Sequence, residues 1–309
     1  MRIIFMGTPD FAVASLDALL KAGFEIIAVV TAPDKPAGRG QKIQESAVKQ
    51  YAVSKGLEVL QPVKLKDPEF LKKLETLNPD LQVVVAFRML PEVVWDMPLM
   101  GTINLHGSLL PYYRGAAPIN WAVINGEKET GVTTFFLQHE IDTGNILFSE
   151  KVPIGDSETA GEVHDKLMYS GAQLLVKTVR AIEAGDYTPV SQEEAIKHAL
   201  LTDELPHAPK IFKEDCLINW NLPAQKVYNH IRGLSPYPTA YTSFKDKILK
   251  IYSAELLSKE PGIQPGGFLS DDKTYLRFAC LDGFICVKDI QLEGKKRMNI
   301  EEFLRGFRS

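Results

Sequence analysis

Two polar residues stand at the end of a predicted strand, and their types suit acyl transfer. Ile103 and Leu105 are apolar and share one face of that strand, because side chains two apart point the same way. Asn104 and His106 therefore share the other face. The Asn104 amide can donate hydrogen bonds to an oxyanion, and the His106 imidazole can move a proton near neutral pH. Spacing alone leaves a second interpretation open, in which both side chains only hydrogen-bond the turn at Gly107.

The surrounding chain predicts that this strand ends at a ligand-binding edge. The strand is followed by a loop that is rich in Gly and Pro and continues to Pro118. In parallel α/β sheets, ligands bind at the loops that follow the carboxyl ends of strands. A further acidic loop, Glu-Ile-Asp-Thr-Gly at 140–144, favours the catalytic interpretation because it supplies a carboxylate.

A long motif begins at Asn104 and reads Asn-x-His-Gly-Ser-Leu-Leu-Pro-x-x-Arg-Gly-Ala-Ala-Pro. It resembles the signature of the 10-formyltetrahydrofolate-dependent formyltransferases. The form Ser-Leu-Leu-Pro-x-x-Arg-Gly-Ala-Ala-Pro-Ile is most similar to the members that formylate methionyl-tRNA. The similarity extends over nearly the whole chain, from Ile3 to the region around Phe303.

This resemblance implies a reaction and three catalytic residues. The formyl group of 10-formyltetrahydrofolate would pass to the α-amino group of initiator methionyl-tRNA, for translation initiation. Asn104 would donate to the oxyanion, His106 would move protons, and Asp142 would orient His106. Asp142 is assigned by the match of Asp-Thr-Gly at 142–144 to the family's motif. No metal is expected, because the sequence has no metal-ligand spacing.

The resemblance also implies where the formyl donor binds. The segment that resembles the folate-contacting loop consists of Ser108, Leu109, Leu110 and Pro111. Its leucines suit the pterin better than the charged glutamyl tail. After the strand at 81–86, Phe87-Arg88 departs from the Tyr-Gly pair that many relatives have.

A basic loop is the expected tRNA contact. Residues 31–45 are predicted to be a loop, and Pro-Ala-Gly-Arg-Gly at 36–40 resembles the segment that enters the acceptor-stem end of tRNA. Its cations, Lys35, Arg39 and Lys42, can neutralise phosphates. Without the resemblance, an ordinary solvated surface loop would be the simpler interpretation.

Hydrophobic patterning predicts an α/β first domain, Rossmann-like, with a mostly parallel sheet. Helices are expected at 10–22, 46–55, 67–78, 118–125 and 159–185. Strands are expected at 2–6, 25–30, 58–61, 81–86, 102–106, 130–136 and 147–152. The opening β-α-β lacks Gly-x-Gly-x-x-Gly, so we interpret its Gly7 turn as structural.

The last third of the chain predicts a small OB-like β-barrel. A helix at 224–232 precedes five short strands, which are expected at 239–244, 248–257, 268–269, 275–279 and 284–291. The polar, proline-containing segment that precedes this helix and these strands is interpreted as a linker. These patterns place domains at 1–189 and 208–309 with a linker at 190–207, and the resemblance implies that the first is the formyltransferase catalytic domain and the second the tRNA-binding domain.

Composition is that of a cytoplasmic globular protein. The 309 residues are 45% hydrophobic and 24% charged, and no apolar run approaches the roughly 20 residues that span a bilayer. The first residues read directly into a strand, so no signal peptide is expected. Three cysteines without Cys-x-x-Cys spacing argue against a disulfide framework or a zinc site. We expect a monomer that does not bind membranes.

Charge is unevenly distributed along the chain. Residues 208–309 hold 16 Lys and Arg against 12 Asp and Glu, whereas the first 207 residues hold 19 against 27. This asymmetry favours polyanion contacts in the second part, although ordinary scatter of surface charge would also produce it.

Two other functions remain open at this stage. One is a formyltransferase of the same fold that acts on a small amine, such as an amino sugar nucleotide or glycinamide ribonucleotide. The basic loop and the basic barrel argue against it. The other is a non-enzymatic nucleotide- or RNA-binding module, which would not require Asn104, His106 and Asp142.

Overall fold

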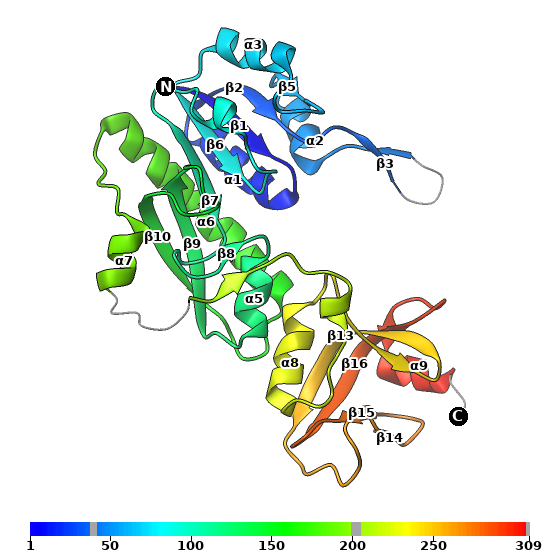
Figure 1. The fold of residues 1–309 in the computed structure, drawn as a ribbon. Helices are drawn as coiled ribbons and strands as arrows, with labels where there is room; N and C mark the ends of the chain where they lie inside the picture. The colour runs from blue at the N-terminus through cyan, green and yellow to red at the C-terminus, as the bar shows by residue number, and fades with distance from the viewer. Residues whose placement is uncertain (38–41, 199–204, 307–309) are drawn as a thin grey trace. The chain divides into compact units, whose positions relative to one another are not determined.

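The chain divides into two compact units, each built around its own sheet. The computed structural model describes residues 1–37, 42–198 and 205–306 (Figure 1). The chain passes between the units several times, so that neither unit is one continuous segment. The first unit contains Met1–Arg114, Gly131–Val152 and Asp165–Pro206, and the second contains Gly115–Thr130, Pro153–His164 and His207–Ser309.

A seven-stranded, mostly parallel sheet forms the centre of the first unit, as predicted. Its order is β10-β9-β7-β6-β1-β2-β5. The five strands from β7 to β5 pair in parallel, and β9 pairs antiparallel with β7. The strands are β1 (Arg2–Gly7), β2 (Glu25–Val30), β5 (Val59–Leu60), β6 (Leu81–Val85), β7 (Thr102–His106), β9 (Glu129–Phe136) and β10 (Ile146–Pro153).

Helices cover both faces of this sheet. Ile4 and Met6 of β1 pack on one face with Phe70 and Val94 from two of the helices. On the other face, Leu105 of β7 lies close to Gly171, so the longest helix covers that side. The helices are α1 (Asp10–Lys21), α2 (Ala47–Ser54), α3 (Pro68–Leu77), α4 (Glu92–Trp95) and α6 (Ala160–Ala184).

The basic loop of the first unit forms a short hairpin. Strand β3 (Lys35–Ala37) pairs antiparallel with β4 (Lys42–Gln44), where the sequence predicted an irregular loop. Next to the hairpin, the Asp34 carboxylate pairs with the Lys49 ammonium at 2.5 Å and accepts a hydrogen bond from Gln61 at 2.8 Å. These bonds anchor one end of β3 to α2 and to the segment after β5.

The second unit has an antiparallel sheet that curls into a half-barrel, with the order β12-β13-β16-β15-β14 and β17 paired to β16 (Figure 1). Its core includes Trp220 stacked on Phe278, with ring centroids 4.7 Å apart. The five predicted strands are confirmed, while β17 and the last helix were not predicted. The elements are β12 (Ala240–Phe244), β13 (Lys247–Leu257), β14 (Phe268–Ser270), β15 (Leu276–Ala279), β16 (Phe284–Leu292), β17 (Met298–Asn299) and α9 (Ile300–Arg305).

Two helices of the second unit meet at a glycine, although they are about one hundred residues apart in sequence. Helix α5 (Pro118–Ile124) packs against α8 (Ala224–Gly233). A Cβ added at Gly233 would lie 2.5 Å from Ile124, so only glycine permits this approach. The Asn120 amide also donates a hydrogen bond to the Gly233 carbonyl at 2.8 Å.

The segment between the predicted domains is not simply extended chain. It contains helix α7 (Gln192–His198) and the short strand β11 (His207–Ala208), which pairs with β8 (Arg114–Gly115). A one-turn 3₁₀ helix follows at Glu214–Cys216.

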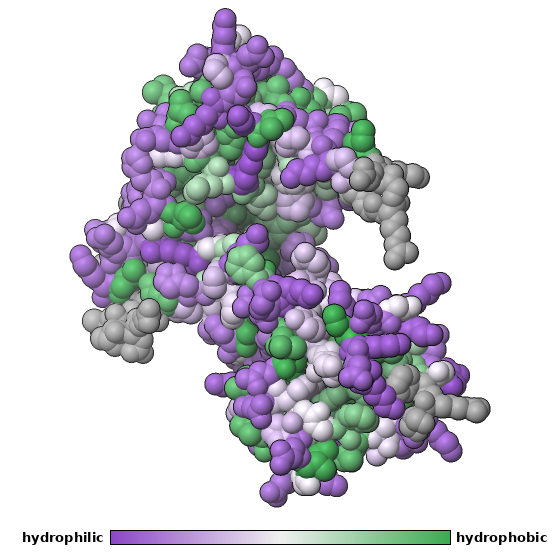
Figure 2. Space-filling model, turned by 45° about the vertical axis from the view of Figure 1, so that its right-hand side comes forward, coloured by the Kyte–Doolittle hydropathy of each residue, from purple (hydrophilic) through white to green (hydrophobic). Residues whose placement is uncertain are grey.

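The face drawn in Figure 2 is largely hydrophilic, with separate hydrophobic patches. Within the described ranges, no helix is both long and apolar enough to cross a bilayer.

Candidate active site

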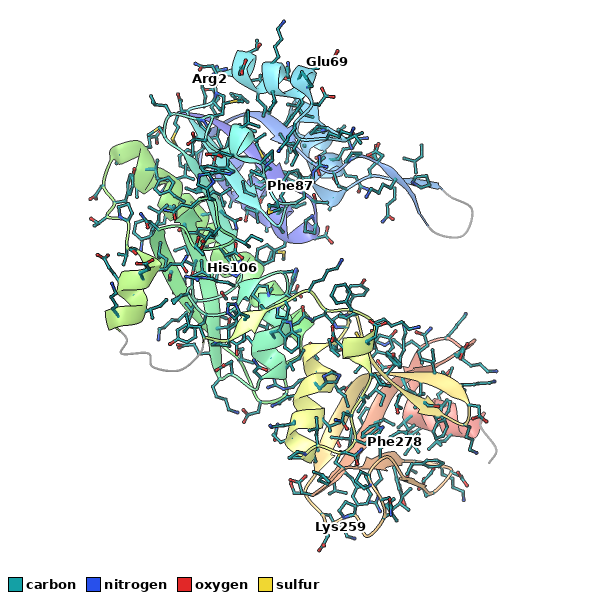
Figure 3. The ribbon with its side chains drawn as sticks, viewed as in Figure 1. Arg2, Glu69, Phe87, His106, Lys259 and Phe278 are labelled. Atoms are coloured by element: carbon teal, nitrogen blue, oxygen red, sulfur yellow. The ribbon has the colours of Figure 1, made fainter. Side chains whose placement is uncertain are left out.

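Asn104 and His106 lie at the carboxyl end of β7, on the face opposite α6, as their alternation predicted. Figure 3 labels His106 there, and Phe87 just after the neighbouring strand β6. In the parallel register Asn104 lies beside Val84 of β6. Within the part of the chain that the structure describes, no group hydrogen-bonds the Asn104 amide, so its N–H donors are available to a substrate.

His106 lies between a backbone carbonyl and a carboxylate. Its Nε2 is 2.9 Å from the Tyr113 carbonyl oxygen, and its Nδ1 is 3.8 Å from Oδ2 of Asp142. A carbonyl oxygen only accepts hydrogen bonds, so Nε2 carries the proton and Nδ1 faces Asp142. The fold thus brings together two residues that only the motif match had linked. At 3.8 Å the pair is close enough for a charge interaction but too long for a hydrogen bond.

The loop after His106 is held against β9 by Thr133. The Thr133 hydroxyl donates to the Ser108 carbonyl at 2.7 Å and accepts from the Leu110 N–H at 3.1 Å. The Ser108 hydroxyl donates to the Tyr112 carbonyl at 2.6 Å. These bonds fix the loop that carries the Tyr113 carbonyl to the position beside His106.

This arrangement bears on the predicted folate segment. Ser108, Leu110 and Pro111 are buried, and Leu109 packs against Gly131 of β9. Three of the four side chains are therefore covered by protein, and Leu109 is the one that stays partly exposed. Folate contact by this segment stays a prediction.

Asp142 occupies a tightly defined turn between β9 and β10. Its φ of 55° is left-handed, which costs a non-glycine residue of order 1 kcal/mol and persists only where the surroundings impose it. Two residues on, a Cβ at Gly144 would lie 1.6 Å from the Phe136 carbonyl oxygen, so the position requires glycine. Gln192 of α7 donates hydrogen bonds from Nε2 to the Asp142 and Gly144 carbonyls, both at 2.8 Å.

Arg114 adds positive charge near this turn. Its Nε and Nη2 donate to Oε1 of Gln192 at 2.9 and 2.6 Å. Burial lowers the pKa of Arg114, while the carboxylates of Asp142 and Glu140 act in the opposite direction. The guanidinium remains charged, and so the site combines an amide donor, an imidazole, a carboxylate and a half-buried cation. That set can stabilise an oxyanion and move a proton, which are the requirements of acyl transfer.

Comparison with family models decides the affiliation of the chain. Residues 1–179 match the formyl transferase model, and residues 210–308 match the model of the formyl transferase C-terminal domain. The chain belongs to the formyl transferase family. The family resemblance predicted from the sequence is thereby confirmed.

Relatives within the formyl transferase family match this chain at nearly full length. A protein of Bacteroides fragilis named methionyl-tRNA formyltransferase is 54% identical over 312 residues, covering 99% of this chain and 95% of its own. A protein of the same name from Parabacteroides distasonis is 56% identical over 314 residues, covering 100% and 96%.

Solved formyl transferase structures share the fold at low identity. The N-formyltransferase from Helicobacter canadensis, in complex with folinic acid and dTDP-3-aminofucose, has a TM-score of 0.67 at 20% identity, covering 96% of this chain and 99% of that one. HypX from Aquifex aeolicus, in complex with tetrahydrofolic acid, has a TM-score of 0.64 at 18% identity, covering 98% of this chain and 47% of that one. At these identities the likeness establishes the fold alone.

The Phe87-Arg88 departure has a local structural role in this formyl transferase. Arg88 donates to the carbonyls of Pro62 and Val63, at 2.9 Å for Val63. Its guanidinium also lies over the Phe87 ring, 5.6 Å from the centroid. Arg88 thus ties the loop after β6 to the segment after β5.

Two of the three predicted tRNA-binding cations of this formyl transferase lie on the strands β3 and β4. Lys35 is exposed on β3, Lys42 begins β4, and Arg39 lies outside the described residues. Their contact with tRNA stays a prediction. Across residues 1–37, 42–198 and 205–306, no group of His, Cys, Asp and Glu side chains is arranged to hold a metal ion.

Sequence reasoning missed Gln192, Thr133 and the Tyr113 carbonyl. Gln192 lies in the polar stretch that had been interpreted as a linker, and a buried glutamine has no sequence signature that separates it from an exposed one. Thr133 was placed on a strand, but its position opposite His106 of β7 depends on how the two strands pair, which the sequence pattern does not give. The Tyr113 carbonyl is a backbone group, so no residue type at that position would have indicated it.

Proposed function

We propose that this chain transfers the formyl group of 10-formyltetrahydrofolate to the α-amino group of initiator methionyl-tRNA. The observation that carries the proposal is the 54–56% identity, over nearly the full length, to relatives named methionyl-tRNA formyltransferase. The set of Asn104, His106 and Asp142 supports the chemistry, because its groups suit attack of an amine on a formyl carbon.

His106 and Asp142 would manage the proton of the reaction. The α-amine has a pKa near 8 and is partly unprotonated at neutral pH, so it can attack directly. A bond forms between this nitrogen and the formyl carbon, and the bond from that carbon to N10 of the folate breaks. The amine proton must reach the leaving nitrogen, and the Nδ1 of His106, facing Asp142, is the group suited to carry it. The carboxylate stabilises the imidazolium formed on the way.

Asn104 would stabilise the negative charge that the attack places on the formyl oxygen. Its amide donors are available and project from the same strand face as His106. Donors that are fixed before the reaction stabilise such charge without reorganising, which makes this effect large in water-excluded sites.

The acceptor would be held by basic elements outside the catalytic residues. We propose that residues 1–189 carry the chemistry and that 208–309 contact the tRNA backbone, joined by 190–207. The β3–β4 hairpin, with Lys35, Arg39 and Lys42, would contact phosphates near the aminoacylated end. We propose that the protein acts in the cytoplasm, where charged tRNA is used, and that it acts as a monomer.

A second candidate is formylation of an amino sugar nucleotide. The likeness of the fold to the Helicobacter canadensis N-formyltransferase, whose structure contains dTDP-3-aminofucose, favours it. That likeness rests on 20% identity, against more than 50% for the methionyl-tRNA enzymes. The first candidate is therefore better supported.

The test is a comparison of acceptors with the full-length protein. The protein is incubated with 10-formyltetrahydrofolate and either initiator methionyl-tRNA, free methionine or dTDP-3-aminofucose. Mass spectrometry of the acceptor, after deacylation for the tRNA, identifies the formylated amine. We expect product only with the charged tRNA. Comparable formylation of the amino sugar nucleotide would favour the second candidate instead.

A further inference from the structure

Gln192 is buried, with only 2% of its surface exposed, and both polar atoms of its side chain form hydrogen bonds within the protein. Its Oε1 accepts two hydrogen bonds from Arg114, and its Nε2 donates to the Asp142 and Gly144 carbonyls. A glutamine amide can accept two and donate two, so its hydrogen-bonding capacity is filled. Such complete use of a buried amide indicates a residue that fixes the groups around it.

The partners decide the orientation of this amide. A guanidinium only donates hydrogen bonds, so the oxygen of Gln192 must face Arg114. The two backbone carbonyls only accept, so the nitrogen must face Asp142 and Gly144. The reversed amide would place two donors against Arg114 and an oxygen against two carbonyls, and is excluded.

Gln192 thereby links the two segments on either side of His106. On one side it holds the backbone of Asp142, whose carboxylate lies 3.8 Å from Nδ1 of His106. On the other side it holds Arg114, which directly follows the Tyr113 carbonyl that receives Nε2 of His106. One amide therefore connects the two chain segments between which the His106 imidazole lies.

We propose that Gln192 is a positioning residue, which sets the separation between His106 and Asp142 by clamping the 142–144 turn to Arg114. This inference rests on the proposed function, since it assigns Gln192 a part in the same reaction. It predicts that Gln192 acts through Asp142 and touches neither substrate.

The alternative is that Gln192 only stabilises the fold, and the two roles differ in measurable ways. A structural residue lowers the free energy of unfolding, and its loss reduces the amount of folded enzyme without altering the turnover of each folded molecule. A positioning residue alters kcat of the folded enzyme. Its effect must also depend on the presence of the Asp142 carboxylate, because that is the group it places.

The experiment is a double-mutant cycle of Gln192→Leu and Asp142→Asn in the full-length protein. Initial rates are measured over ranges of charged tRNA and of 10-formyltetrahydrofolate, and thermal unfolding is followed in parallel. Gln82→Leu is the matched control: Gln82 is also a buried glutamine of the first unit, on β6, and its amide accepts a hydrogen bond from Thr102 at 3.2 Å.

We expect Gln192→Leu to lower kcat about 10- to 100-fold, as expected for a catalytic group displaced by roughly 1 Å. Both KM values should stay within about twofold of wild type, because the substrate contacts are unchanged. In the Asp142→Asn background the same change should lower kcat by less than about threefold, because the placed group has already been removed. Gln82→Leu should leave kcat unchanged, because Gln82 hydrogen-bonds Thr102, at the start of β7, and contacts neither His106 nor Asp142.

Two results would overturn the inference: unchanged kcat in Gln192→Leu, or a loss that is fully retained in the Asp142→Asn background. If Gln192→Leu does not fold, Gln192→Glu replaces it in the cycle, because it keeps the volume and the acceptor for Arg114 while its ionised carboxylate cannot donate to the carbonyls. If Asp142→Asn alone retains wild-type turnover, or if no acceptor is formylated, the assignment of the site fails, and the failure lies with the proposed function.

Discussion

Replacing Gly144 by alanine tests how closely the turn that carries Asp142 is constrained. The added Cβ would lie 1.6 Å from the carbonyl oxygen of Phe136 and 2.8 Å from its carbonyl carbon. Real contacts of this kind essentially never fall below 3.0 Å, so the turn or the end of β9 must move apart by at least 1.4 Å. Because the obstacle is backbone, a rotamer change cannot relieve it.

The displacement should affect turnover more than folding. Asp142 lies two residues from Gly144, and its carboxylate is already 3.8 Å from His106. A misplacement of about 1 Å can lower a rate about 10²-fold, so we expect kcat of Gly144→Ala to fall by about that factor. Overpacking typically costs about 1–3 kcal/mol, which leaves a domain of ordinary stability folded.

The assay measures kcat and both KM values for formylation of charged tRNA, together with urea unfolding. Gly155→Ala is the control, because the three atoms nearest to its Cβ would all belong to the flexible side chain of Glu158, at 3.2 Å or more. That variant should retain wild-type kcat. Wild-type kcat in Gly144→Ala would refute the reasoning, since it would mean that the turn can move without consequence for the reaction.

Four further predictions concern single side chains. Asn104→Ala should lower kcat about 10²–10³-fold and His106→Ala about 10²–10⁴-fold, in steady-state assays with unfolding curves close to wild type. Arg39→Ala should raise KM for charged tRNA. It should also make the slope of log K for tRNA binding against log salt concentration shallower by about one, while folate affinity measured by fluorescence stays unchanged. Hydrogen bonds, chiefly from Lys49, lower the pKa of Asp34, so this carboxylate stabilises the fold above its unfolded pKa of about 3.9, and that stabilisation is lost as pH falls through the folded pKa. Asp34→Asn should therefore unfold at lower urea than wild type at pH 7, and the difference should shrink below about pH 4.

The central sheet was predictable because its strands have a simple physical cause. Residues 81–85 are apolar except for Gln82, as expected for a parallel strand that is covered on both faces, and the structure buries all five. The start of α3 was predicted from the sequence as well. The carboxylate of Asp67 accepts the Glu69 N–H at 2.9 Å, and Pro68 begins the helix, as capping rules predict.

The site was only partly predictable, because catalytic groups meet through tertiary contacts. The period of a strand is enough to place Asn104 and His106 on one face. No local pattern brings Asp142 to His106, and that link came from the family motif alone. The role of Gln192 could not be predicted, because α7 is short and mostly polar, and no local pattern marks its first residue as the one that hydrogen-bonds the 142–144 turn.

The hairpin at 35–44 and helix α9 were missed for another reason. Both are short elements, whose stability comes from what they contact and hardly from intrinsic propensity. The salt bridge of Asp34 with Lys49 beside the hairpin joins residues fifteen apart, and a periodicity argument does not detect it.

The close crossing of α5 and α8 has a consequence for how the protein is made. Helix α5 ends at Ile124, and the glycine against which it packs is Gly233, so α5 leaves the ribosome about one hundred residues before its partner. At synthesis rates of about 5–20 residues per second, that interval lasts roughly 5–20 seconds. Throughout it, the nascent chain presents the part of the α5 surface that α8 will later cover. A message that ends before codon 233 would leave that surface uncovered permanently, so we expect such fragments to be bound by chaperones and degraded.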